Sequence, residues 1–209
     1  MPAETLPPTS GTRGGGRHAT RDRLVACAFE LFAREGFHAV GLDRILADAG
    51  ISKQTFYNHF ESKDELVEEV LRFRDAWEMR TTRDLLRQFA GGEEPCAQLY
   101  AVFDMLHAWF TDPAFQGCLF MNAAAEFPNP FEPAHQIAAD HARSVEALLF
   151  DLAARAGVAE PGRLAEELTV VIHGAIAVRH ITGNTDAAAV ARRFGEPLLD
   201  RYLGCGVGN

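Results

Sequence analysis

The sequence lacks long hydrophobic runs. None of its apolar stretches approaches the roughly 18 residues that a bilayer-spanning helix needs. The first residues, MPAETLPPTSGTRGGGR, are polar and rich in proline and glycine, unlike the apolar core of a secretory signal peptide. We therefore expect a cytoplasmic protein without a membrane partner.

Cysteine is scarce, and catalytic signatures are missing. The four cysteines form no CxxC pair, which argues against a disulfide framework or a zinc knuckle. No GxSxG, HExxH or paired-carboxylate pattern occurs, and the glycine run at 14–16 lacks the Lys-Ser/Thr of a phosphate loop. The eight histidines show no ligand spacing on any one predicted helix. We predict a protein that is not an enzyme and needs no metal and no cofactor.

An excess of positive charge is also missing. The formal net charge of −9 argues against a protein that coats nucleic acid nonspecifically. Residues 1–63, however, hold 8 Lys and Arg against 7 Asp and Glu, a net of +1, so residues 64–209 carry −10. A nearly neutral head on an acidic body fits DNA contact restricted to one end of the chain.

What the sequence does contain is helical periodicity. Apolar residues recur at three- and four-residue spacings, and we find no strand pattern and no internal repeat. Glycine and proline clusters, such as GGEEP at 91–95, separate the helical segments. The sequence predicts an all-α fold with a disordered tail over 1–17, a three-helix helix-turn-helix domain over 18–64 and a larger helical domain over 65–203. The helices are expected at about 20–35, 42–49, 53–60, 62–89, 95–110, 134–156, 163–181 and 186–203.

The stretch from Gly41 to Phe60 has the layout of a helix-turn-helix. Gly50 follows the first helix and readily takes the left-handed conformation that ends one. Ser52 is placed to cap the second helix, which two phenylalanines four residues apart anchor. This short helix is rich in hydrogen-bond donors, as expected of a helix that enters the major groove of DNA. Its polar residues are Lys53, Gln54, Thr55, Tyr57, Asn58 and His59.

These residues resemble the TetR family of bacterial transcriptional repressors. The matching blocks are FAREGF at 32–37, AGIS at 49–52, FYNHF at 56–60 and SKDEL at 62–66. The resemblance, over roughly residues 20–67, implies a homodimer that binds a palindromic double-stranded DNA operator. It also implies that a small-molecule effector, bound in the domain over 65–203, releases the DNA.

The resemblance assigns roles at the DNA. It implies that Lys53, Gln54, Thr55 and Asn58 read bases, and that Tyr57, His59 and Lys63 hold phosphates. For Tyr57 and His59, packing and helix capping are the alternative. Gly41 stands where the family commonly has a Ser or Thr that caps a helix and touches a phosphate. The arginines at 13, 17, 21 and 23 are either a solvated tail or a basic arm on the DNA.

Aromatic residues of the larger domain are candidates for lining an effector pocket. The candidate effector-binding residues are Phe103, His107, Trp109, Phe110, Phe120 and Phe127. For any single one of them, filling the hydrophobic core is the alternative.

Cys118 offers a second way to sense a signal. The segment GCLFMNAAAEF at 117–127 resembles a branch of the family that includes electrophile-responsive repressors. Cys118 follows a proline-containing turn, and a helix that begins there would place it at a helix N-terminus, where the helix dipole favours a thiolate. A thiol-based redox or electrophile sensor is therefore the alternative function, and an inert buried thiol is the alternative role of Cys118.

The helix predicted over 163–181 is apolar on nearly all sides, as LTVVIHGAIAV at 168–178 shows. Such a helix must be buried on both sides. A second subunit is the simplest cover for the side that does not face its own core. We expect this helix and the one over 134–156 to form a four-helix interface with their copies, and we place Ile176 within it.

Overall fold

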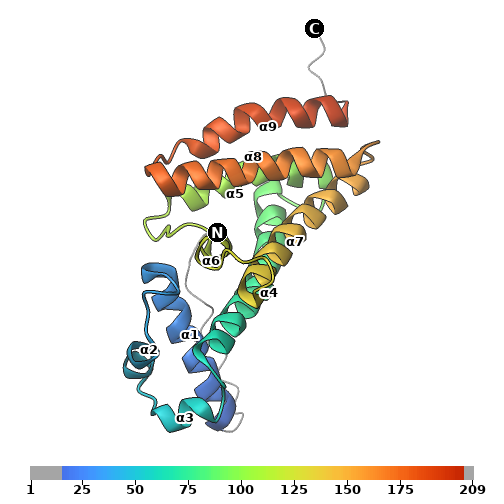
Figure 1. Ribbon diagram of the computed structural model, residues 1–209. Helices are drawn as coiled ribbons and strands as arrows, with labels where there is room; N and C mark the ends of the chain where they lie inside the picture. Colours follow the sequence, from blue (N-terminus) through green and yellow to red (C-terminus); the bar gives the residue numbers. More distant parts are fainter. Residues whose placement is uncertain (1–15, 205–209) are drawn as a thin grey trace. The chain divides into compact units, whose positions relative to one another are not determined.

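A computed structural model of the protein describes residues 16–204 (Figure 1). Within this range the chain forms nine helices and no strand, which confirms the all-α prediction. Most of the tail predicted over 1–17 lies outside the described residues, and α1 begins at Gly16 instead of near residue 20. The helices are α1 (Gly16–Glu35), α2 (Leu42–Ala49), α3 (Lys53–Tyr57), α4 (Lys63–Ala90), α5 (Pro95–Thr111), α6 (Leu119–Glu126), α7 (Pro133–Arg155), α8 (Pro161–Thr182) and α9 (Ala187–Leu203).

The described chain divides into two compact units that do not follow chain order. The first unit holds residues 16–76 and 118–140, and the second holds residues 77–117 and 141–204. Helices α4 and α7 continue from one unit into the other. The sequence predicts a boundary near residue 64, but it does not predict that α6 and the start of α7 belong with the helix-turn-helix.

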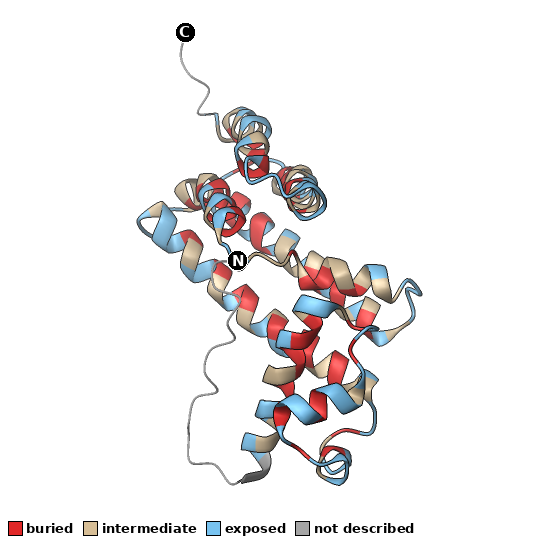
Figure 2. Ribbon diagram, turned by 90° about the vertical axis from the view of Figure 1, so that its left-hand side faces the viewer, coloured by how far each residue is buried: buried red, intermediate tan, exposed pale blue. Residues whose placement is uncertain are grey.

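The first unit has a single hydrophobic core built by six helices. Leu24, Ala28 and Phe32 recur at helical spacing on α1 and are fully buried. They share the core with apolar residues of α2, α3 and the first turns of α4. Leu119 and Phe120 of α6 and Ala134 of α7 complete it. In the helices drawn in Figure 2, buried residues recur along one side and exposed residues along the other, as amphipathic sequences require.

In the second unit, α9 packs against both α5 and α8 (Figure 1). Gly195 of α9 lies against the ring of the fully buried Phe103 of α5, and a β-carbon at this position would overlap that ring. The Tyr100 hydroxyl of α5 donates to Asp200 of α9 at 2.5 Å beside this contact. No described helix combines the length and the apolar character that crossing a membrane requires.

Candidate DNA-binding site and subunit surface

The turn between α2 and α3 has the geometry that the sequence predicts. Gly50 adopts φ 62° and ψ 40°, in the left-handed region, and the N–H of the buried Ile51 donates to the Leu46 carbonyl at 3.0 Å. Ser52 caps α3, because its Oγ accepts from the Thr55 N–H at 3.1 Å. Gly41 caps α2 in an extended conformation and provides no side-chain hydrogen bond. These local interactions fix how the second helix leaves the first.

Helix α3 is shorter than the sequence predicts, because it ends at Tyr57. Asn58 and His59 lie beyond it in a tight turn, where their N–H groups donate to carbonyls three residues back, at 3.2 and 2.8 Å. Phe56 and Phe60 are buried and stack with ring centroids 5.6 Å apart, so they hold this turn on the core. The expectation that Asn58 and His59 are part of the helix is therefore wrong.

Several side chains proposed to read or grip DNA point away from the core. Lys53, Gln54, Tyr57 and Asn58 are exposed, and the Tyr57 ring is 50% exposed. Thr55 is half-buried, with its hydroxyl 2.8 Å from the Ser52 hydroxyl. The exposed part of α3 thus presents an ammonium, an amide and a phenol to a partner.

Two cations near this site already have partners within the first unit. The Lys63 ammonium donates to the Phe37 carbonyl at 2.6 Å, and partial burial lowers the pKa of this lysine despite the nearby carboxylates. Arg21 forms an ion pair with Glu69 at 2.5 Å and lies over the Phe60 ring, 5.0 Å from its centroid. Arg23 is exposed. Residue 13 lies outside the described range.

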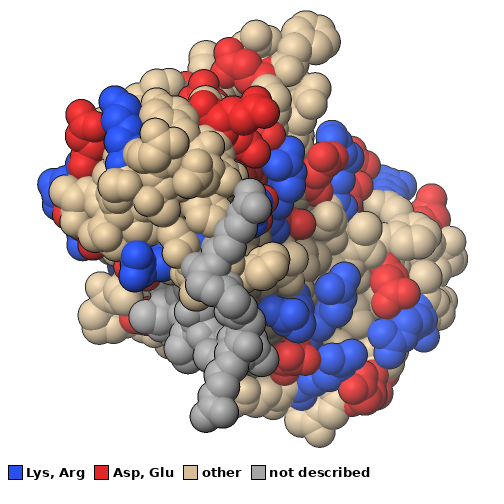
Figure 3. Space-filling model, turned by 90° about the horizontal axis from the view of Figure 1, so that it is seen from below, with Lys and Arg blue, Asp and Glu red and all other residues tan. Residues whose placement is uncertain are grey.

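Ser62 and Glu65 cap the start of α4. The Glu65 N–H donates to Ser62 Oγ at 3.1 Å. The Glu65 carboxylate in turn accepts from the N–H of Glu61. The face drawn in Figure 3 carries lysine and arginine interspersed with aspartate and glutamate. Acidic side chains therefore interrupt the basic ones on this face (Figure 3), which has no continuous basic field among the described residues.

A carboxylate far along the chain holds the loop between α1 and α2. Glu126, the last residue of α6, accepts from the N–H groups of Phe37 at 3.0 Å and His38 at 2.7 Å. Burial raises the pKa of Glu126, but these hydrogen bonds outweigh it, so the pKa is lowered. Sequence reasoning missed this residue. The available signal was that Glu126 is the only charged residue of its helix.

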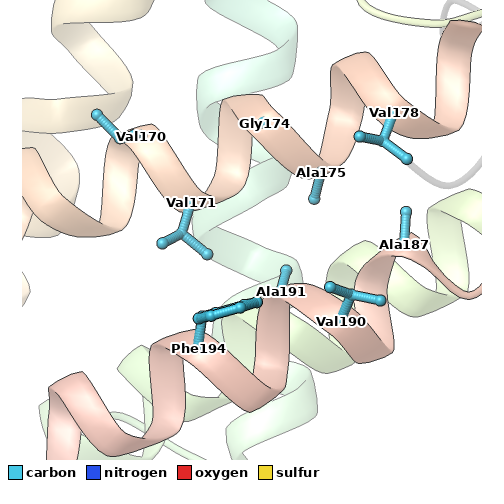
Figure 4. Close-up of a pocket in the computed structure, with 9 residues that line it drawn as sticks. All are labelled: Val170, Val171, Gly174, Ala175, Val178, Ala187, Val190, Ala191 and Phe194. Atoms are coloured by element: carbon cyan, nitrogen blue, oxygen red, sulfur yellow. The ribbon is translucent and has the colours of Figure 1, made fainter.

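An apolar groove runs between α8 and α9 in the second unit (Figure 4). It has a volume of about 220 Å³ and no charged residue in its lining. Apolar side chains of its lining are exposed, among them Val170 at 68%, Val178 at 45% and Phe194 at 66%. Its lining is Val170, Val171, Gly174, Ala175, Val178, Ala187, Val190, Ala191 and Phe194.

The burial of Ile176 differs from what its predicted place in the subunit interface requires of a single chain. Ile176 is only 7% exposed within a single chain, so it belongs to the core of the second unit. The exposed large apolar residues of α8 are Val170, Val178 and Ile181, and α9 adds Phe194. The sequence analysis missed Phe194, although the spacing of Ala187, Val190, Ala191 and Phe194 is that of one helix face.

Comparison with known proteins decides the family. Residues 24–70 match the description of bacterial regulatory proteins of the tetR family, and residues 95–194 match a tetracyclin repressor-like C-terminal domain. The chain belongs to the TetR family. The two matches cover most of the described chain and agree with the resemblance noted around the helix-turn-helix.

The curated relatives match only part of the TetR-family chain. The transcriptional activator FasR of Mycolicibacterium smegmatis is 43% identical over 68 residues, 31% of this chain and 31% of FasR. The transcriptional repressor KstR2 of Rhodococcus jostii is 38% identical over 68 residues, 32% of each protein. The chain thus spans about a third of the length of these curated relatives. A crystal structure of a TetR-family regulator from Streptomyces coelicolor has 28% identity and a TM-score of 0.78, with 89% of this chain and 97% of that one covered.

The residues predicted to bind an effector in this TetR-family chain fall into both units. Phe103, Trp109 and Phe110 are buried in the second unit, whereas the neighbouring His107 is exposed. Phe120 and Phe127 instead pack in the core of the first unit, because α6 belongs to that unit. The structure therefore does not gather the six predicted residues into one unit.

Trp109 lies in a small aromatic cluster in the second unit. Its ring centroid is 5.0 Å from that of Phe115 and 5.8 Å from that of Phe110. The Arg179 guanidinium of α8 stacks over Phe115, 4.4 Å from the centroid, and donates to the Phe110 carbonyl at 2.9 Å. Trp109 Nε1 is buried and has no hydrogen-bond partner among the described residues.

The second unit also contains three ionisable side chains that influence one another, those of Glu78, His141 and His173. His141 is buried, and its Nε2 lies 3.8 Å from a Glu78 carboxylate oxygen. The pKa of His173 is lowered, mainly by burial and to a smaller extent by electrostatic repulsion from His141. No group of residues in the described range has the composition and geometry of a metal site.

Cys118 is the N-cap residue of α6, a helix that is absent from the list of helices predicted from the sequence. Its side chain is half-buried and makes no capping hydrogen bond to the helix. Cys27 is also half-buried, and both cysteines pack against the first unit's core. The Cys27 sulfur lies 3.8 Å from the Ile45 carbonyl, and burial raises the pKa of its thiol. The two thiols thus differ in that only Cys118 stands at the N-terminus of a helix.

Proposed function

We propose that this TetR-family protein is a cytoplasmic transcriptional repressor that binds a palindromic operator as a homodimer and is released by a small-molecule effector. The observation that carries the proposal is the helix-turn-helix, in which Lys53, Gln54 and Tyr57 are exposed on a helix anchored by buried phenylalanines. A lysine can bind guanine O6 and N7, and a glutamine can pair with an adenine edge. The names of the relatives, an activator and a repressor of transcription, support a regulatory role.

The groove between α8 and α9 supports the homodimer. Contiguous exposed apolar surface of this kind marks an interaction site in soluble proteins. A second copy is the occupant that the proposed operator requires, because a palindrome is read by two symmetric heads. In the proposed dimer, the partner covers the exposed Phe194 ring and the open surface beside Gly174.

The cluster around Trp109 supports an effector site in the second unit. A buried indole N–H without a partner costs roughly 1–3 kcal/mol. An effector with an aromatic or apolar body and one hydrogen-bond acceptor removes this cost when the acceptor reaches Nε1. Arg179, stacked on Phe115, favours an acceptor with negative charge.

Selection of DNA from a random-sequence pool by the wild-type protein tests the proposal. The expected result is one palindromic sequence, bound by two protomers, with an affinity that falls steeply as the salt concentration rises. Enrichment of no sequence, or binding of one protomer to an asymmetric site, would contradict the proposed mode of action.

Thiol sensing at Cys118 is the second candidate function, favoured by the position of this cysteine at the N-terminus of α6. If it operates, iodoacetamide should label Cys118 well before Cys27 and release the operator, and Cys118→Ser should bind DNA but lose the release. Labelling by mass spectrometry and DNA binding are measured on the same samples. Equal labelling of the two thiols, or release that persists in Cys118→Ser, would leave the reversible effector as the signal.

A further inference from the structure

The loop between α1 and α2, residues 36–41, is held by side chains from two other helices of the first unit. The Phe37 N–H donates to Glu126 Oε1 of α6, and the Phe37 carbonyl accepts from Lys63 of α4 at 2.6 Å. The next N–H, that of His38, donates to Glu126 Oε2 at 2.7 Å, and His38 Nδ1 lies 3.0 Å from the same oxygen. Both carboxylate oxygens of Glu126 are therefore bound to this loop.

The residues around this contact fit closely. Gly36 has φ 89°, a conformation that favours glycine, and a β-carbon there would lie 2.9 Å from Glu126 Oε1. The fully buried Phe37 ring lies between Phe32 and Phe127, with centroids 5.1 and 5.7 Å away. The Phe127 ring also contacts the His38 ring, at 4.8 Å. The backbone amides and the flanking rings together admit one placement of the loop.

This loop leads directly into the helix-turn-helix. Helix α2 starts at Leu42, and its N-cap, Gly41, supplies no side-chain hydrogen bond. The start of α2 is thus fixed mainly by the loop before it and by the core beneath it. Because α3 follows α2 through a tight turn, a shift of this loop moves the helix that presents Lys53 and Gln54.

We propose that Glu126 is a positioning residue for DNA binding, which holds the α1–α2 loop so that α2 and α3 meet the operator. Hydrogen bonds between backbone N–H groups and a carboxylate are about twice as strong as neutral ones. Because Glu126 is the last residue of α6, its carboxylate couples the position of α2 and α3 to the position of α6. The inference rests on the proposed operator binding, and the test below separates the two.

The test compares Glu126→Gln with Glu132→Gln, in full-length protein, on an operator duplex selected by the wild type. Both variants remove one negative charge from the same unit. Glu132 lines the same surface hollow as His38, yet no hydrogen bond within the described chain joins its side chain to the α1–α2 loop. Electrostatics alone predicts slightly tighter DNA binding for both variants, because each repels the phosphates less.

We expect the opposite for Glu126→Gln. A glutamine side chain places an NH2 donor where one of the two carboxylate oxygens stands, so one of the two backbone N–H groups faces a donor in place of an acceptor. Operator affinity should therefore fall about tenfold or more at constant salt, which corresponds to about 1.4 kcal/mol or more. Glu132→Gln should bind as tightly as the wild type or tighter. Hydrogen exchange followed by mass spectrometry should speed up at residues 36–41 in Glu126→Gln, while the peptides of α1 and α4 keep their protection.

Two results would overturn the inference. One is a folded Glu126→Gln that binds the operator as tightly as Glu132→Gln. The other is loss of exchange protection throughout α1–α4 in Glu126→Gln, which would make the residue part of the fold and not of the positioning. If the wild type itself selects no DNA, the proposed function fails and not the loop contact, because the exchange measurement still reports that contact.

Discussion

Gln54 and Lys63 differ in what their side chains do before any DNA is present. Gln54 is exposed, whereas the Lys63 ammonium already donates to the Phe37 carbonyl. Gln54→Ala should leave stability within about 0.5 kcal/mol and relax specificity at one base pair by roughly 1–3 kcal/mol. Binding to the selected operator and to its single-base variants measures this. A uniform loss on all duplexes would remove Gln54 from the base-reading residues.

Lys63→Ala should instead have two effects. It should weaken binding to every duplex, with a salt dependence reduced by about one released counterion, if its ammonium also reaches a phosphate. It should also lower the free energy of unfolding by roughly 1–2 kcal/mol, because a partly buried hydrogen bond from a charged group is lost. Thermal unfolding and salt titrations separate the two. An unchanged salt dependence with lower stability would leave Lys63 with its internal role alone.

His173 makes the stability of the second unit sensitive to acid. Its pKa is lowered in the folded chain, so the unfolded chain binds the proton more readily in the pH range around and below the ordinary histidine pKa. Its contribution is therefore present above that range and is lost as the pH falls toward the folded-state pKa. The melting temperature should fall between pH 7.5 and 5.5 less in His173→Gln than in the wild type. The exposed His107→Gln is the control and should follow the wild type.

At the scale of elements, the close packing of α5 against α9 depends on Gly195, because glycine has no side chain. Gly195→Ala should destabilise the protein by about 1–3 kcal/mol, because the added methyl overlaps the buried Phe103 ring. The control is Gly162→Ala on α8, where the nearest atom to a β-carbon is 3.9 Å away. It should be neutral or stabilise by up to about 1 kcal/mol through helix propensity. Equal denaturation midpoints for the two variants would contradict this packing.

The role of helix α6 cannot be predicted from its own residues. The helix has eight residues and one charge, so its sequence pattern predicts only that it is buried. The core of the first unit takes Leu119 and Phe120, and the last side chain binds a loop 88 and 89 residues earlier in the chain. The partner of Glu126 depends on where the chain returns, and no local pattern carries that information.

At the scale of the whole molecule, assembly depends on the groove between α8 and α9. Phe194→Glu should give monomers at micromolar concentration, because a charge buried without a partner costs roughly 3–5 kcal/mol, or more than a hundredfold in dimer affinity. Operator binding should be lost with the dimer. Phe131→Glu replaces another exposed phenylalanine, 83% exposed and outside these helices, and should remain dimeric. Sedimentation decides, and a monomeric wild type would contradict the proposed interface.

The sequence by itself determined most of the helices, α6 excepted, and the helix-turn-helix. Gly50 ends one helix and Ser52 begins the next through bonds that span three to five residues, so short-range rules were sufficient. The sequence predicts that α3 continues beyond Tyr57, where the helix in fact ends. The polar side chains of Asn58 and His59 do not reveal that the backbone forms a tight turn between Phe56 and Phe60. The same short range explains why the family could be identified from the first part of the chain.

Only the tertiary structure decided which face of each helix is covered and which distant groups meet. Ile176 and Val170 are equally apolar in sequence, but one is buried by its own chain and the other is exposed. Phe120 packs in the core of the first unit, and the Glu126 carboxylate accepts hydrogen bonds from two backbone N–H groups of the same unit. Burial and pairing across 50 or more residues depend on how all the helices pack at once, and periodicity along one helix cannot specify that.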